Sequence, residues 1–132
     1  MKKGFTLLEL LVVIAIISLL GSLIFTQFES TRARGRDAER EKEIKTIQNA
    51  LAIYVINNLN YPVYSGALNG SDPVSVALIS NGAIPQIPFD SFNTGNFVYS
   101  YTSADGSTYT LTYYLETNSI PGKPAGMQTA RP

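Results

Sequence analysis

An uncharged stretch near the N-terminus constrains the fold more than any other feature. Residues 10–28 are nineteen residues without a charged side chain. As one helix rising about 1.5 Å per residue, they would span roughly 28 Å, close to the hydrocarbon thickness of a bilayer. A cleaved signal peptide would have a shorter apolar region ending in a small-x-small site, for which Gly21 and Ser22 are only weak candidates. We therefore predict a retained membrane-spanning helix, with Lys2 and Lys3 on the cytoplasmic side.

Glu9 stands just before this stretch. A carboxylate costs roughly 2.5–3.5 kcal/mol near the centre of a bilayer and less near its edge, and the apolar run offers no basic partner. Cleavage between Gly4 and Phe5 would create an α-amino group one helical turn before Glu9. That amine could pair with Glu9 of the same chain or, in a staggered assembly, of another. A Glu9 hydrated at the membrane interface is the alternative that the residues leave open.

The helical pattern continues beyond the membrane segment. Five apolar residues recur there at three- and four-residue spacing, which gives the helix one apolar face. They are Ile44, Ile47, Leu51, Tyr54 and Val55. The first proline is Pro62, and a residue before proline disfavours helix, so the helix should end just before it. We predict a single helix from about residue 5 to residue 58.

Residues 29–45 carry eleven charges, among them Arg32, Arg34, Arg36 and Arg40. Acids nearly balance bases there, so we predict a solvated helix or a contact between subunits rather than a nucleic-acid arm. The arginines would also suit anionic lipid headgroups. Within the long helix, glycines at positions 21 and 35 are candidate weak points, because glycine costs about 1 kcal/mol relative to alanine.

The remainder predicts a small antiparallel sheet. Residues 62–96 are rich in proline and glycine and indicate loops, with a short helix over 74–82 and an extended connector over 83–90. Apolar residues alternate over 97–102 and 108–115 around Asp105-Gly106, which predicts a hairpin whose aromatic and aliphatic face covers the helix. Residues 117–132 predict a surface strand or a loose tail.

Composition excludes much catalytic chemistry. The chain has no His and no Cys, which removes a Ser-His-Asp triad, a thiolate nucleophile, a thiolate zinc site and any disulfide. Ten basic residues balance ten acidic ones, so no specific binding of nucleic acid is expected. The acids after residue 60 are Asp72, Asp90, Asp105 and Glu116. They lack the close spacing of a calcium loop, so we expect no cofactor and no enzyme, with calcium left as an open alternative.

The leader Met-Lys-Lys-Gly, followed by Phe-Thr-Leu-Leu-Glu-Leu-Leu, resembles the class III signal of the type IV pilin and type II secretion pseudopilin superfamily. The resemblance implies that a prepilin peptidase cuts after Gly4 and methylates the amine of Phe5. It also implies that Glu9 neutralises the amine of the adjoining subunit. Some related pseudopilins bind calcium. Two features common in pilins are absent, a proline near Thr26 and a C-terminal cysteine pair.

The expected fold is α+β and pilin-like, one long N-terminal helix packed on a small antiparallel sheet. We predict a leader over residues 1–4, a transmembrane and assembly helix over 5–28, and a soluble head over 29–132. The predicted function is that of a type IV pilus subunit, with a major pseudopilin of a type II secretion system as the alternative. A single-span membrane-anchored binding domain and a small secreted enzyme are more remote alternatives.

The predicted partners follow from this function. They are copies of the chain in a homopolymer, a prepilin peptidase, an inner-membrane assembly platform and the lipid bilayer before assembly. The precursor is expected in the inner membrane and the assembled chain in an extracellular filament.

Overall fold

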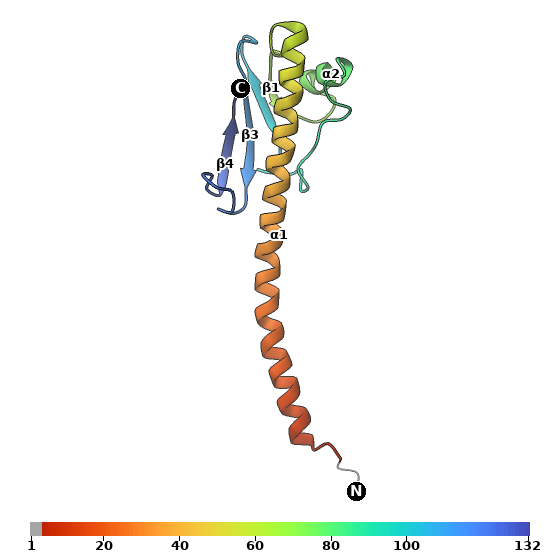
Figure 1. Cartoon of the computed structure of the whole chain (residues 1–132), viewed down its shortest axis with the longest axis vertical. Helices are drawn as coiled ribbons and strands as arrows, with labels where there is room; N and C mark the ends of the chain where they lie inside the picture. The colour runs from red at the N-terminus through yellow and green to blue at the C-terminus, as the bar shows by residue number, and fades with distance from the viewer. Residues whose placement is uncertain (1–3) are drawn as a thin grey trace. The chain divides into compact units, whose positions relative to one another are not determined.

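The computed structural model describes residues 4–132, apart from the side chains of residues 23–26. The elements follow in the order α1 (Leu7–Asn58), β1 (Tyr64–Ala67), α2 (Pro73–Ser80), β2 (Ser100–Ser103), β3 (Thr110–Leu115) and β4 (Gly126–Ala130) (Figure 1). The predicted α+β fold is confirmed. The chain forms two compact units, Met1–Ala33 and Arg34–Pro132, and we call the second unit the head. The predicted cytoplasmic residues Lys2 and Lys3 lie outside the described part.

The N-terminal unit contains the apolar part of α1. The large apolar side chains described between residues 7 and 20 are all exposed, because no other element of the described chain covers them. By length and composition, α1 is the one helix among the described residues that could cross a membrane. It begins at Leu7, two residues later than predicted. The predicted weak points Gly21 and Gly35 both lie within it.

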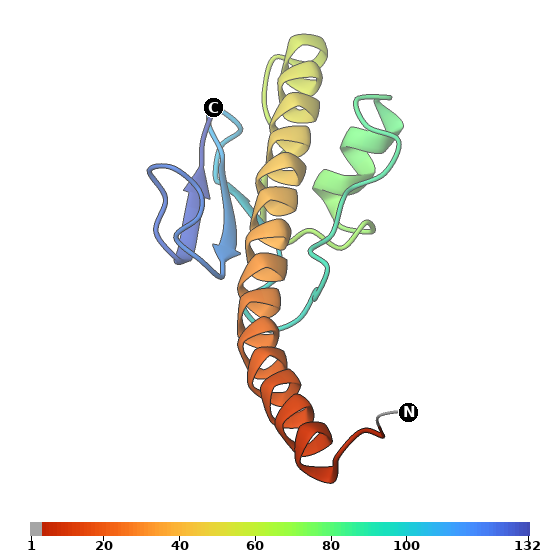
Figure 2. The ribbon, with the colours of Figure 1, turned by 60° about the horizontal axis from the view of Figure 1, so that its bottom comes forward.

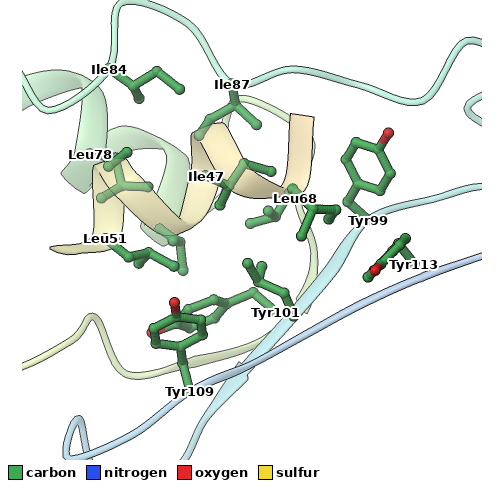
Figure 3. Close-up of a cluster of buried hydrophobic side chains, with 14 of the residues drawn as sticks. Ile47, Leu51, Leu68, Leu78, Ile84, Ile87, Tyr99, Tyr101, Tyr109 and Tyr113 are labelled. Atoms are coloured by element: carbon green, nitrogen blue, oxygen red, sulfur yellow. The ribbon is translucent and has the colours of Figure 1, made fainter. Parts of the chain in front are cut away.

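In the head, α1 lies between the sheet on one side and α2 with its following connector on the other (Figure 2). The predicted apolar face of α1 is confirmed, since Ile44, Ile47 and Leu51 are buried. Buried tyrosines of the sheet and apolar residues from the α2 region complete the core around them (Figure 3). These are Tyr99, Tyr101, Tyr109, Tyr113, Leu78, Ile84 and Ile87.

The predicted hairpin is also confirmed. β2 pairs antiparallel with β3, with Tyr101 opposite Leu111. The buried residues of β3 alternate with partly exposed ones, so the aromatic and aliphatic face covers the helix as predicted. β2 begins at Ser100, three residues later than the alternation suggested.

β1 lies within residues 62–96, for which the sequence predicts loops. It has only four residues and pairs antiparallel with β2, so that the sheet order is β1-β2-β3-β4. A Cβ at its Gly66 would lie 2.5 Å from the hydroxyl oxygen of Tyr64, so a larger residue there would displace the Tyr64 side chain. The local preference of these four residues for strand is weak, and pairing with the edge of β2 compensates for it.

The C-terminal tail forms β4, the surface strand that was one of the two predicted possibilities. It pairs with β3 from Leu111 opposite Ala130 to Leu115 opposite Gly126. The side-chain amide of Gln48 also donates a hydrogen bond of 2.8 Å to the carbonyl of Arg131. In a chain without cysteine, backbone pairing and this contact hold the tail.

The short helix α2 confirms the predicted segment. The carboxylate of Asp72 caps its N-terminus by accepting a hydrogen bond of 2.9 Å from the backbone N–H of Ser75, and Pro73 stands at the first helical position. The chain leaves the helix through Asn81 and Gly82, whose φ is +73°.

Candidate functional site

Thr6 and Glu9 form a capping box at the start of α1. The Glu9 carboxylate accepts hydrogen bonds of 2.9 Å from both the backbone N–H and the hydroxyl of Thr6. In return, the backbone N–H of Glu9 donates to the Thr6 hydroxyl at 3.2 Å. The first backbone bond of the helix runs from the N–H of Leu10 to the carbonyl of Thr6 at 3.2 Å. Thr6 is therefore the N-cap and Glu9 the third helical residue.

This geometry changes the place predicted for Phe5. Phe5 precedes the N-cap, so it lies outside the helix and is not one regular helical turn from Glu9. Its ring and the side chain of Leu10 line one shallow hollow, as expected for the hydrophobic pair that often flanks a capping box. Gly4 and Phe5 are both exposed. The roles of Gly4, Phe5 and Glu9 in cleavage, methylation and assembly stay predictions.

The sequence predicted no basic partner for Glu9 within the apolar run of the uncut chain. The structure gives it Thr6 as a neutral partner within one turn. The signal that could have revealed the pair is the sequence Thr-Leu-Leu-Glu before an apolar run, since Ser or Thr followed three residues later by Glu is the mark of a capping box.

A second polar cluster lies inside the head and centres on Arg40. Its guanidinium donates to Asp37 at 2.9 Å, to Glu116 at 2.6 Å and to both carboxylate oxygens of Asp90. Arg36 adds a two-pronged contact to Glu116, at 2.8 and 2.6 Å. Arg40, Asp37 and Asp90 are buried, so the cluster is largely removed from water.

The cluster joins three segments that are distant in sequence. Asp37 accepts hydrogen bonds from the backbone N–H groups of Glu116 and Thr117, which fixes the end of β3 against α1. Asp90 ends the connector that follows α2 and accepts from the backbone N–H of Phe92 at 2.8 Å. The Arg40 guanidinium also lies 4.6 Å from the ring centre of Phe97.

These contacts favour the ionised forms of Glu116 and Arg40. The hydrogen bonds from Arg36, and then those from Arg40, lower the pKa of Glu116 below its usual value despite partial burial. Burial by itself would lower the pKa of Arg40, but the bonds to Asp90, Glu116 and Asp37 outweigh it and the pKa is raised. At neutral pH Glu116 and Arg40 are therefore both charged.

The solvated helix predicted for residues 29–45 is wrong for Asp37 and Arg40, which are buried. The connector predicted over 83–90 contains Asp90, and its pairing with Arg40 was not predicted. Arg40 and Asp37 precede the buried Ile44 by four and seven residues, so they continue the same helix face inward. This spacing could have predicted that Asp37 and Arg40 are buried.

Two tyrosine hydroxyls bind acids on α1. Tyr99 donates to Glu43, and Tyr113 donates to Glu41 at 2.5 Å. Lys123, from the loop between β3 and β4, reaches the same Glu41 at 2.6 Å and the Tyr113 hydroxyl at 2.7 Å. Burial, followed by the bond to Glu41, raises the pKa of Tyr113.

The acids considered for calcium are already engaged by protein groups. Asp72 caps α2, Asp105 accepts from Ser107 in the β2–β3 turn, and Asp90 and Glu116 bind Arg40. Among the described residues, no group of three or more acids or other metal-binding side chains is placed to hold a metal ion. The donor set of the head does not fit a calcium site.

Comparison with known proteins adds independent findings. Residues 1–25 match the family model of the prokaryotic N-terminal methylation motif. The chain is 30% identical over 95 residues to the type II secretion system core protein G of Escherichia coli K12, covering 67% of this chain and 66% of the relative. It is 32% identical to the protein of the same name from Aeromonas hydrophila, over 52% of this chain and 48% of the relative. For the Vibrio cholerae protein of that name, the identity is 27% over 77% of this chain and 71% of the relative.

The chain thus spans about half to two thirds of the length of the first two of these relatives. No solved structure matches it significantly. The alignments extend well beyond the leader, and the long helix on a small antiparallel sheet agrees with the fold that the leader implied. By leader, fold and relatives, the chain belongs to the superfamily of type IV pilins and type II secretion pseudopilins.

Proposed function

We propose that this protein is the major pseudopilin of a type II secretion system, a structural subunit that polymerises into a filament. The observation that carries the proposal is the similarity to proteins named type II secretion system core protein G, over 95 residues in the first case. The sequence alone favoured a subunit of a type IV pilus and kept the pseudopilin as the alternative. The relatives support that alternative better than the pilus.

Processing is the first step of the proposed function. A prepilin peptidase cuts between Gly4 and Phe5 and methylates the new amine. Both residues are exposed and precede the first helical residue, so the bond to be cut lies in non-helical backbone. Mass spectrometry of the mature protein should find methylated Phe5 at its N-terminus. An intact Met1, or a cut beyond Gly21, would contradict this step.

Glu9 then acts in assembly. In the uncut chain its carboxylate is satisfied by Thr6, which allows it to enter the membrane without a cation. After the cut, the methylated amine of an adjoining subunit is a stronger partner, because a charged donor binds a carboxylate more tightly than a neutral one. The pair would neutralise both charges and set the axial register between subunits.

The apolar surface of α1 supplies the driving force for polymerisation. Its large side chains are uncovered in the single chain, for example Leu7 at 83% and Leu19 at 66% exposure. They are solvated by lipid while the precursor waits in the membrane. Once the subunit is extracted, copies of the same helix must cover them, since each such side chain is worth about 1.5–3 kcal/mol when removed from water. An inner-membrane assembly platform would couple extraction to this reburial.

Deletion of the gene in the native organism distinguishes a pseudopilin of a secretion system from a subunit of a type IV pilus. We expect loss of exoprotein release into the medium, with surface fibres unchanged by electron microscopy. Reintroducing the wild-type gene should restore release, whereas a Gly4→Asp variant blocked in cleavage should not. Loss of surface fibres with normal release would instead establish the pilus function and overturn the proposal.

A further inference from the structure

A polar hollow of about 490 Å³ lies on the head and is lined by Arg34 of α1 and by Thr117, Asn118 and Ser119 of the loop between β3 and β4. All four residues belong to the same compact unit. The lining consists of one guanidinium, two hydroxyls and one amide, with no carboxylate. The Arg34 guanidinium and the Asn118 side-chain amide offer hydrogen-bond donors and a positive charge, which favours an anionic ligand.

Arg34 differs from the other arginines of its segment. Arg32 pairs with Glu29 at 4.0 Å, Arg36 with Glu116 at 2.6 Å, and Arg40 with the buried cluster. Arg34 is exposed and, within the part of the chain that the structure describes, makes no ion pair or hydrogen bond. Its five N–H donors therefore remain available to a ligand.

The opposite wall of the hollow is fixed by contacts within the head. Asn118 accepts a hydrogen bond of 2.6 Å from the backbone N–H of Ala125 through its side-chain oxygen, which leaves its side-chain amide as a donor. The Thr117 hydroxyl donates to a carboxylate oxygen of Asp37 at 2.7 Å and lies 2.7 Å from the Ser119 hydroxyl, so these two hydroxyls are engaged within the head. The loop is thus held in place before any ligand binds.

The position of Arg34 in the chain limits the source of the anion. It follows residue 28, the last of the uncharged stretch, by six residues. Six residues span about 9 Å as a helix and at most about 20 Å when fully extended. When the uncharged stretch crosses the bilayer, Arg34 is therefore confined to the headgroup layer or to the water just beyond it. Lipid phosphates are the densest anions at that depth.

We propose that this hollow binds the phosphate of a phospholipid headgroup while the uncut or stored subunit is in the membrane. The proposal rests on the membrane-inserted state assumed in the proposed function, but not on the type of filament that the subunit forms. Bound lipid would orient the head on the membrane surface, and extraction into a filament would require its release.

Native mass spectrometry of the full chain, released from detergent micelles, tests the proposal. The probes are phosphatidylglycerol and a galactosyl diacylglycerol that lacks phosphate. We expect the wild type to retain phosphatidylglycerol and not the galactolipid. Arg34→Gln should lower the retained phosphatidylglycerol about fivefold, the effect of one basic residue near an anionic surface. Arg131→Gln is the matched control, because Arg131 is exposed and outside the hollow, and it should retain lipid like the wild type.

A second arm distinguishes lipid from soluble phosphate. Amide NMR shifts of Asn118 and Ser119 are followed during titration with glycerol 3-phosphate and, separately, with phosphatidylglycerol in micelles. We expect shifts with the lipid at tenfold or more lower concentration than with glycerol 3-phosphate. Equal response to both probes, equal loss of lipid in the two arginine variants, or unchanged lipid retention in Arg34→Gln would each overturn the proposal.

Discussion

Replacing Arg40 with glutamine is the sharpest test of how the head is held together. Glutamine keeps a polar side chain of similar reach but removes the positive charge. The side chain of Arg40 is 2% exposed, and those of Asp37 and Asp90 are fully covered. The variant would therefore leave two buried carboxylates without the cation that now compensates them.

The two carboxylates are not equally affected. Asp37 keeps hydrogen bonds from two backbone N–H groups and from the hydroxyl of Thr117. Asp90 keeps only the N–H of Phe92 among its described partners. Breaking a buried ion pair by removing one partner costs about 3–5 kcal/mol. We expect a loss near the lower end, about 3 kcal/mol, out of the 5–15 kcal/mol typical of a domain of this size.

Equilibrium urea unfolding of the full chain in detergent micelles measures this loss. The chain has no Trp, and all eight Tyr lie after residue 53, so tyrosine fluorescence reports on the head alone. Arg34→Gln is the matched control and should change stability by less than about 0.5 kcal/mol, because Arg34 is exposed. Adding Asp90→Asn to Arg40→Gln should recover part of the loss by removing the stranded charge. A loss below about 1 kcal/mol for Arg40→Gln, or no recovery in the double variant, would refute the reasoning.

Four further predictions concern pH, metal removal, the Lys123 ion pair and assembly. Because the folded state lowers the pKa of Glu116 below its usual 4.5, this group stabilises the head above that pH and the contribution is lost as pH falls through the lower folded value. Urea midpoints should therefore drop in acid, and less so in Glu116→Gln. Excess EDTA should leave the midpoint unchanged, whereas a fall that calcium reverses would show a metal site. Lys123→Met should cost about 0.5–1 kcal/mol, since the ion pair is partly exposed. Glu9→Ala should be inserted and cleaved but should not co-purify with wild-type filaments, and normal incorporation would reject its assembly role.

The parts of the fold that follow a strong period were predictable from the sequence. The face formed by Ile44, Ile47 and Leu51 is set by helical spacing, and the hairpin by alternation around Asp105-Gly106. In both patterns, the spacing of the apolar residues indicates directly which side chains are buried. The short strand β1 shows no such pattern, because its four residues include a glycine and do not alternate clearly between apolar and polar. The strand is formed by pairing with the edge of β2, which lies more than 30 residues further along the chain.

The ion cluster around Arg40 could not be predicted from the sequence, for a different reason. A charged residue in a sequence is read as exposed by default, since Arg and Asp are seldom buried without partners. The partners of Arg40 stand 50 and 76 residues away, at Asp90 and Glu116. Only the fold brings them together, and only the helix face shared with Ile44 hinted that Arg40 turns inward.

The candidate assembly site was predictable in part. Glu9 stood out because a carboxylate beside an apolar run needs an explanation, and the leader supplied one. Its hydrogen bonds with Thr6 are local and could have been predicted from the sequence Thr-Leu-Leu-Glu. The choice between pilus and secretion could not be read in this way, because it depends on other proteins that the subunit meets.

The contacts of Arg40 also bear on how one subunit can serve in two environments. All of its described partners lie in the head, as do the residues of the buried core. The ion cluster therefore lies at the part of the core nearest in sequence to the membrane segment and needs no group from that segment. Because the head core is complete without the apolar helix, moving that helix from lipid into a filament does not require the core to rearrange. In the proposed function, the free-energy cost of extraction then falls on the helix surface and on the release of lipid from the hollow beside Arg34, and contact with other copies can offset the first of these.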